Sequence, residues 1–195
     1  VAYSGTGSAG ANVFHNLGVK PELLISKARD STSDWYVSGT ILGDTGFDAY
    51  NLKLNSTASL ANDQAIFSSA YWDNGFVYNT GQNTSLLNAS GTNYIAYLFS
   101  SLAGVSKVGS VSHTSGSATN VDCGFTAGCR FLILKRTDAI SDWWVFDTAR
   151  GITSGNDARL LLNSAQAETS TDQIDPYSAG FTIDGNRATG DYIFY

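Results

Sequence analysis

The stretch Ser141–Asp147, with the sequence SDWWVFD, decides the fold, because a shorter copy, SDWYV at Ser33–Val37, occurs earlier in the chain. Each copy follows an apolar run that ends in a lysine, Leu23–Lys27 or Phe131–Lys135. In both copies an aspartate lies three residues after that lysine, and the Asp-Trp pair begins seven residues after it. A match over so many positions indicates an internal repeat, and we interpret the chain as a tandem repeat of one module.

Further segments recur in the same order in both halves. They are a Leu-x-Leu-Asn-Ser segment, a Gly-Phe pair and a closing Tyr-Ile pair: Leu52–Ser56 and Leu160–Ser164, Gly75–Phe76 and Gly180–Phe181, Tyr94–Ile95 and Tyr192–Ile193. We therefore predict a first repeat over residues 1–102 and a second over residues 103–195. Two arrangements stay open: each repeat forms its own small sandwich, or both fuse into one larger sandwich.

The residue pattern predicts an all-β fold. Short runs rich in Tyr, Phe, Val and Ile are broken by Gly, Asn, Asp and Ser, which is typical of strands joined by turns. Six or seven such runs per repeat favour a β-sandwich. Only 56–67 and its counterpart 164–171 depart from this pattern, and for both we expect a loop or a short helix.

The composition excludes several classes of protein. Net charge is -6 and the charged fraction is 14%, against about 25% in typical domains. Nucleic-acid binding needs clusters of Lys and Arg, which this acidic chain lacks. No apolar stretch is long enough to span a bilayer. The absence of Met and an ending that reads as an interrupted strand, Tyr192–Tyr195, predict a processed product or a piece of a longer protein.

The order of these motifs resembles that of a known family. A Gly/Ser-rich start, Leu-Gly-x-x-Pro, an apolar strand ending in Lys, Asp-Trp, Leu-x-Leu-Asn, Gly-Phe and Ser-Gly-x-x-Tyr-Ile together resemble a domain of unknown function of bacteriophage virion proteins. That domain often occurs in tandem in tail-fibre-like proteins. It is held to resemble the jelly-roll sandwich of concanavalin-A-like lectins and glucanases. Repeat two keeps the family's Asp, Arg and Gly after the Trp strand as Asp147, Arg150 and Gly151, whereas repeat one has Gly39 and Leu42 in place of the first two.

The resemblance implies a virion structural protein at the virion surface, outside the cell. The leading hypothesis is a tail-fibre or surface-projection module that attaches to host surface glycans through many weak sites. Its partners would be other virion proteins and like subunits in a homo-oligomer, a trimer in fibres of this kind. The alternative is a purely architectural protein that decorates a capsid or forms a filament. Neither hypothesis involves nucleic acid, membrane insertion or a cofactor.

A polysaccharide hydrolase is the third hypothesis, and the acids argue against it. A glycosidase needs two carboxylates at a fixed separation. The chain has two glutamates, Glu22 and Glu168, and neither has an aspartate two residues on. Asp142 and Asp147 are the pair whose replacement would test this hypothesis. We predict that the protein is not an enzyme.

Sugar binding needs an exposed aromatic ring beside polar side chains, because a pyranose has an apolar face and a polar rim. Candidates are the residues at which the two repeats differ: Trp72, Asp73, Asn74, Tyr78, Asn79 and Trp144. The competing interpretation is that Trp72 packs over the base of a loop. Trp35 and Trp143 occupy equivalent positions, which favours repeated core anchors.

The remaining candidates concern cysteines and metals. Cys123 and Cys129 are separated by a Gly-containing segment, so a disulfide and two free thiols are both open interpretations. Asp30 and Asp138 recur in both repeats, as do Asp34 and Asp142. We interpret these aspartates as turn residues in preference to calcium ligands, because no Asp-x-Asp-x-Asp-Gly loop is present. We predict no metal site.

Overall fold

The computed structural model describes residues 1–195 except 9, 44–49, 63–66, 73–74 and 79–83, and for 67–72, 75–78 and 84–85 it describes the backbone alone. Contacts divide the chain into two compact units, Val1–Ser100 and Ser101–Tyr195, here called the N-module and the C-module. The division lies next to the predicted boundary after residue 102. Among the described residues no helix is long and apolar enough to cross a bilayer.

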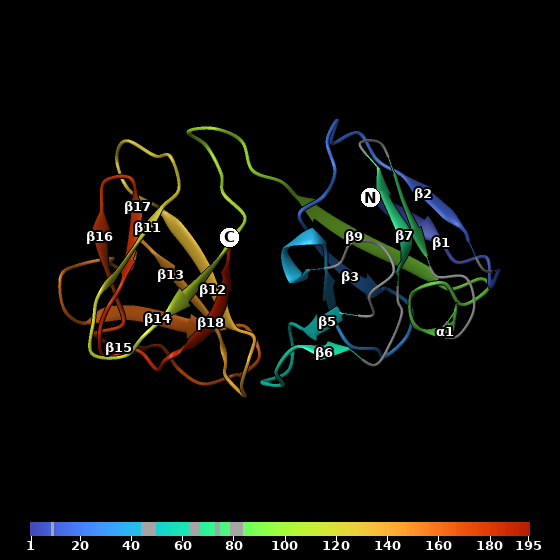
Figure 1. Ribbon diagram of the computed structural model, residues 1–195. Helices are drawn as coiled ribbons and strands as arrows, with labels where there is room; N and C mark the ends of the chain where they lie inside the picture. Colours follow the sequence, from blue (N-terminus) through green and yellow to red (C-terminus); the bar gives the residue numbers. More distant parts are fainter. Residues whose placement is uncertain (9, 44–49, 63–66, 73–74, 79–83) are drawn as a thin grey trace. The chain divides into compact units, whose positions relative to one another are not determined.

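The N-module consists of one six-stranded and one three-stranded antiparallel sheet (Figure 1). The larger sheet has the order β1-β9-β3-β4-β5-β6, and the smaller has the order β2-β8-β7. The bounds are β1 Ala2–Ser4, β2 Asn12–Phe14, β3 Leu23–Ala28, β4 Tyr36–Ser38, 3-10 helix η1 Thr40–Leu42, β5 Tyr50–Lys53, β6 Ala61–Asn62, β7 Phe67–Trp72, β8 Gly75–Tyr78, α1 Thr84–Leu87 and β9 Asn93–Phe99.

The C-module has the same two sheets in the same order. Its larger sheet is β10-β18-β12-β13-β14-β15, and its smaller sheet is β11-β17-β16. The bounds are β10 Gly109–His113, β11 Thr119–Asp122, β12 Phe131–Arg136, β13 Trp143–Asp147, β14 Asp157–Leu161, β15 Thr169–Thr171, β16 Ile174–Tyr177, β17 Gly180–Ile183 and β18 Gly190–Phe194. The strand orders of the two modules therefore correspond, element by element.

The fold is an all-β sandwich of antiparallel strands, as predicted. The Gly-Phe pairs begin β8 and β17, and the Tyr-Ile pairs lie in β9 and β18. Of the loop and the short helix that we expected, the described residues of 56–67 and residues 164–171 show the loop, which leads into the short strands β6 and β15. Helix α1 arises elsewhere, at Thr84–Leu87.

The core of the C-module lies between its two sheets. Strand β13 contributes Phe146, and Trp144 on the same face packs against the core cluster. The smaller sheet contributes Phe181 and Ile183 from β17, and both are buried. Since side chains alternate along a strand, Trp143 lies on the opposite face of β13. It is buried, as an anchor should be, but it is not part of this cluster.

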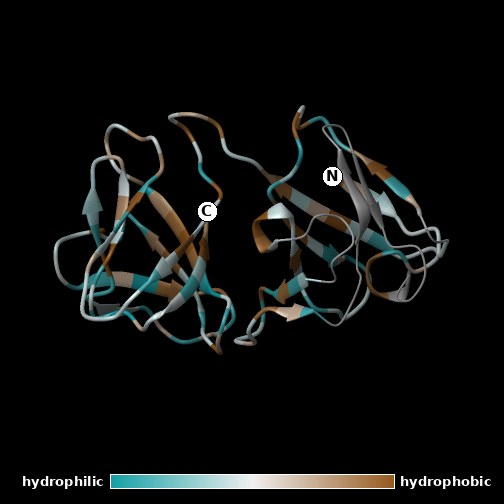
Figure 2. Ribbon diagram, viewed as in Figure 1, coloured by the Kyte–Doolittle hydropathy of each residue, from teal (hydrophilic) through white to brown (hydrophobic). Residues whose placement is uncertain are grey.

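The N-module has a smaller cluster built in the same way. Leu24 of β3, Tyr36 of β4 and Tyr94 of β9 come from the larger sheet, and Val13 of β2 packs against them. Tyr94 stacks on Tyr3 with 5.1 Å between ring centroids. Strands β3 and β12 each begin with a run of hydrophobic residues, and Figure 2 colours the ribbon by the hydropathy of each residue.

The repeated Asp-Trp-Asn residues form one polar clasp per module. In the C-module the Trp143 N–H donates to Asn163 Oδ1 at 2.7 Å, and Asn163 Nδ2 donates to Asp142 Oδ1 at 2.7 Å. In the N-module, Trp35, Asn55 and Asp34 make the same two hydrogen bonds, at 2.9 and 3.0 Å. One amide thus satisfies a backbone donor at the start of the Trp strand and orients a carboxylate. These hydrogen bonds explain why the Asp, Trp and Asn residues recur at the same spacing in both modules.

The lysine that ends each apolar strand folds back over the same turn. Lys27 Nζ donates to the Ser31 carbonyl and to Ser33 Oγ, and Lys135 Nζ donates to the Ser141 carbonyl. Lys135 is fully buried, and burial lowers its pKa to about 8. The fixed spacing between lysine and Asp-Trp therefore reflects the span of one side chain across a turn.

Asp30 and Asp138 bind the closing strand of their modules, not the local turn that we expected. Asp30 Oδ2 accepts the Asn93 N–H at 3.0 Å, and Asp138 Oδ1 accepts the Asp191 N–H at 3.1 Å. In the C-module Arg136 binds Asp138 at 2.7 and 2.9 Å, and this pairing lowers the pKa of Asp138 to about 2. These contacts join segments that are far apart in the sequence.

A substitution at Asn163 tests the clasp. Asn163→Asp keeps the acceptor for Trp143 N–H but places a second carboxylate against Asp142. We expect the free energy of unfolding at neutral pH to fall by about 1–3 kcal/mol, because a hydrogen bond becomes a repulsion. The loss should shrink as acid protonates the carboxylates. Urea unfolding across this pH range measures both effects.

Asn55→Asp is the matched control. Its neighbour Asp34 is paired with Lys53 at 2.7 Å, so the new repulsion is partly offset. The destabilisation should therefore be smaller than for Asn163→Asp. Equal stability of Asn163→Asp and the parent at neutral pH would contradict the clasp.

Candidate functional site

The C-module contains a cavity of about 470 Å³, within the range of small-molecule sites. Its walls come from the joint before β10, the segment between β11 and β12, and the strands β12, β17 and β18. Its aromatic lining consists of Phe125, Phe131, Phe181, Phe194 and Tyr195. Phe131 is 48% exposed and Val105 is 71% exposed, so this wall opens to solvent.

The segment that forms one wall is held by the turn between β16 and β17. Cys123 N–H and Phe125 N–H both donate to the Ala179 carbonyl, at 2.8 and 3.1 Å. Cys129 N–H donates to the Gly180 carbonyl at 2.9 Å. A Cβ at Gly180 would lie 2.1 Å from the Val121 carbonyl oxygen, so only glycine fits there. The wall is therefore positioned by backbone contacts.

Two basic side chains of the cavity stand apart from the others in the C-module, all of which the structure describes. Lys107 and Arg130 line the cavity, and neither side chain has a hydrogen bond, ion pair or ring contact there. The module's other basic side chains are engaged: Lys135 with Ser141, Arg136 with Asp138, Arg150 with Asp147, Arg159 with Thr169 and Thr171, and Arg187 with Trp144. The cavity thus combines aromatic walls with two available cations.

Cys123 and Cys129 are free thiols on the cavity wall. Of the two interpretations of the sequence, the structure has the thiols and not the disulfide. Burial raises the pKa of each thiol to about 11, and the neighbouring Cys123 adds to the effect on Cys129. Because the thiolate is the reactive form, neither cysteine is suited to nucleophilic chemistry at neutral pH.

Thiol labelling tests this assignment. At about pH 8 the native protein should react slowly with a thiol reagent, because both thiolates are disfavoured, and denaturant should release two fast-reacting thiols. Cys123→Ser and Cys129→Ser should each release one. Rapid labelling of the native protein, or a mass lower by two hydrogens after purification without reductant, would contradict it.

Trp144 is engaged inside the C-module. The guanidinium carbons of Arg187 and Arg159 lie 3.5 and 4.1 Å from its ring centroid. Arg187 is 2% exposed, and its guanidinium also lies 4.8 Å from the Tyr192 ring. Burial lowers the pKa of Arg187 to about 10. This ring packs against arginines, so its geometry does not provide the open sugar platform that the sequence suggested.

The other predicted sugar contacts lie outside the described part of the chain. Trp72 and Tyr78 belong to β7 and β8, but their side chains are not described, and Asp73, Asn74 and Asn79 lie outside the described residues. Of the predicted anchors, Trp143 is buried and Trp35 is half-buried, with its ring 6.4 Å from that of Tyr97. The structure therefore brings none of the described sugar candidates to the cavity.

Asp142 and Asp147 do not form a glycosidase pair. They lie at opposite ends of β13, five residues apart, which corresponds to about 16 Å along a strand and to opposite faces. Glycosidase carboxylates lie about 5–9.5 Å apart. Asp142 is bound by Asn163, and Asp147 pairs with Arg150. Both acids have structural partners.

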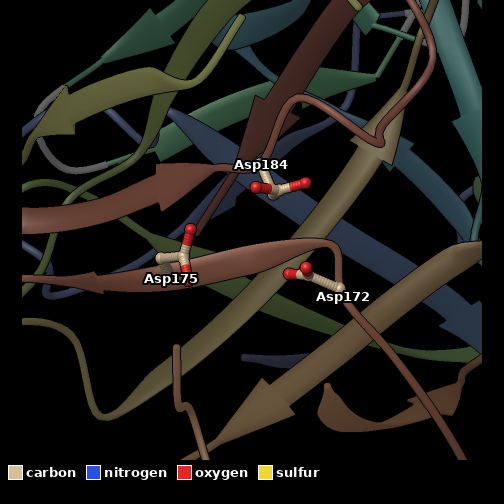
Figure 3. A group of neighbouring side chains, drawn as sticks. All are labelled: Asp172, Asp175 and Asp184. Atoms are coloured by element: carbon tan, nitrogen blue, oxygen red, sulfur yellow. The ribbon is translucent and has the colours of Figure 1, made fainter. Parts of the chain in front are cut away.

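A cluster of three aspartates lies on the β16–β17 hairpin. Carboxylate oxygens of Asp172, Asp175 and Asp184 lie within 4.8 Å of one another, and Figure 3 shows the three side chains together. Such an oxygen set suits a hard divalent cation. Burial raises the pKa of Asp172, and the charges of Asp184 and Asp175 raise it further. No metal ligands were predicted here from the sequence, although a hairpin centred on residues 178–179 would have brought these three acids to the same end of the two strands.

Asp172→Asn tests the repulsion in this cluster. A raised folded-state pKa means that ionisation of Asp172 opposes folding, so stability is lost as pH rises above the usual range of an aspartate. The variant should therefore melt at a higher temperature than the parent at neutral pH, and the difference should vanish in acid. Thermal unfolding by circular dichroism across pH measures this. A lower melting temperature for Asp172→Asn in metal-free buffer would contradict the expectation.

The cavity was also missed by sequence analysis. One signal could have marked it: the residue before the apolar strand is Arg130 in the second repeat and Glu22 in the first. This reversal of charge occurs inside an otherwise matched segment.

The family of the chain follows from comparison with known proteins. Residues 1–195 match a family described as "Domain of unknown function (DUF7483)", and the chain belongs to this family. Comparison with curated proteins gave no match. Comparison with solved structures gave none either.

Proposed function

We propose that this member of the family is a non-catalytic attachment module of a virion, part of a tail fibre or another surface projection, that binds host surface glycans. Two β-sandwich modules and the resemblance of their motifs to virion proteins support the proposal. The observation that carries it is the aromatic cavity of the C-module. Five of its lining residues are aromatic and none is Asp, Glu or His, so the cavity offers the apolar surface that a bound sugar ring needs.

The mechanism is non-covalent. The exposed Phe131 ring offers an apolar surface to the C–H face of a pyranose, and Ser106 and Thr126 provide hydroxyl groups at the same cavity. A single site of this kind is weak, because few groups contact the sugar. A homo-oligomer, such as a trimer in a fibre, would carry several copies of the site. These copies would raise the overall affinity for the glycan through multivalency.

An architectural role is the second candidate, supported by exposed apolar side chains of the C-module. Leu102, Val105 and Ile140 are at least 60% exposed, and side chains of this type often lie at subunit contacts. In that case the chain would decorate a capsid or form a filament, without a ligand of its own. A homo-oligomer that buries Phe131 and Val105 and binds no glycan would favour this role.

A glycan array probed with the full chain tests attachment. We expect a defined subset of glycans to bind, and Phe131→Ala to weaken that binding about fivefold, because stacking on an aromatic ring contributes about 1 kcal/mol. Ile140→Ala removes a similar apolar surface outside the cavity and serves as the control. Absence of glycan binding at high probe density would sink the proposal, as would unchanged binding by Phe131→Ala.

A further inference from the structure

The cations of the cavity are unusual for this chain. The C-module has ten acidic and seven basic side chains, and the chain as a whole has a net charge of -6. Most bases of the module are bound to acids, hydroxyls or aromatic rings, yet Lys107 and Arg130 are not. Both of these side chains line the same cavity. An acidic module that leaves its two unengaged cations at one cavity presents a local positive site.

The chemistry of these two side chains favours a carboxylate. Arg130 carries a planar guanidinium that binds a carboxylate through two parallel hydrogen bonds, and Lys107 adds a compact charge. Lys107 is half-buried and its charge reaches Cys123, where it lowers the thiol pKa against the larger effect of burial. The charge of Asp122 acts on the same thiol in the opposite sense, so at Cys123 the effect of Lys107 is partly offset.

The aromatic wall restricts the ligand further. Phe131 is 48% exposed and lines the same cavity as Arg130, so a ring that stacks on Phe131 lies in the cavity that the guanidinium also lines. A pyranose with a carboxylate on its ring meets both conditions, since its apolar face and its charged edge are adjacent. An aliphatic acid would not need an exposed ring beside the cation.

We infer that the cavity of the C-module binds an acidic sugar, a pyranose whose carboxylate is held by Lys107 and Arg130 while its apolar face stacks on Phe131. The inference rests on the proposed glycan attachment and specifies the class of glycan. It assigns the site to the C-module alone. In the N-module Glu22 occupies the position of Arg130 before the equivalent strand, and its charge would repel the same ligand.

Titration calorimetry of the full chain tests this inference with matched ligands. The acidic ligand is an oligogalacturonate, and its methyl ester is the neutral counterpart with the same sugar rings. Octanoate is the aliphatic acid. We expect the oligogalacturonate to bind, the ester to bind at least about tenfold more weakly, and octanoate to bind more weakly than the oligogalacturonate. The affinity for the oligogalacturonate should fall as salt is added.

Variants locate the carboxylate. Arg130→Gln and Lys107→Gln should each weaken oligogalacturonate binding about tenfold and leave binding of the ester unchanged. Arg130→Glu, which copies the residue of the N-module, should abolish oligogalacturonate binding. Lys20→Gln makes the same change in net charge at an exposed site of the N-module and should have no effect. An unchanged melting temperature shows that each variant is folded.

The outcomes separate this inference from the proposed function. Equal binding of oligogalacturonate and its ester overturns the acidic-sugar inference and leaves glycan attachment in place. The acidic-sugar inference is also overturned if Lys20→Gln weakens binding as much as Arg130→Gln. Binding of octanoate without any glycan overturns both. Failure of every glycan on the array and in solution removes the proposed function and, with it, this inference.

Discussion

The fold depends on the insertion of the closing strand into the larger sheet of each module. In the C-module β18 lies between β10 and β12, and Tyr192 and Phe194 carry it into the core. The paired strands are distant in sequence, so loop-closure entropy opposes the pairing until the burial of these rings offsets it. A Cβ at Gly109 would lie 2.2 Å from the Phe194 ring, so a larger residue there would have to displace that ring. Phe194 also lines the cavity, which therefore exists only in the closed module.

Polar contacts then set the register of the strands, which hydrophobic burial does not determine. Burial alone does not select one register, because it is not directional. The Asn163 clasp sets the start of β13, and Asp138 ties the end of β12 to the closing strand. Each contact uses a side-chain amide or carboxylate oxygen to accept a hydrogen bond from a backbone N–H group. In such a chain a basic group without a partner, as at Arg130, is conspicuous.

Sequence patterns predicted the parts of the structure that depend on local periodicity. The apolar runs became β3 and β12, and the Gly-Phe pairs marked the starts of β8 and β17. The contacts of Trp144 could not be predicted, because Arg159 reaches its ring from β14 and Arg187 reaches it from the segment between β17 and β18. The cavity was equally inaccessible, since its walls come from segments near residues 105, 125, 181 and 194 that only the tertiary fold brings together. Prediction of the aspartate cluster would have required the register of the β16–β17 hairpin.

A difference between matched sequence positions of the two modules is a guide to function only when the differing residue also lacks a structural partner. Trp144 and Arg150 differ from their counterparts in the first repeat, yet Trp144 packs against Arg187, and Arg150 pairs with Asp147. Both side chains therefore have structural partners within the C-module, which account for the differences. Arg130 differs as well, and its charge is directed to no acid of the module. A cation kept in this state beside an exposed aromatic ring costs the fold little, because it stays hydrated, and it is ready to exchange that water for a ligand.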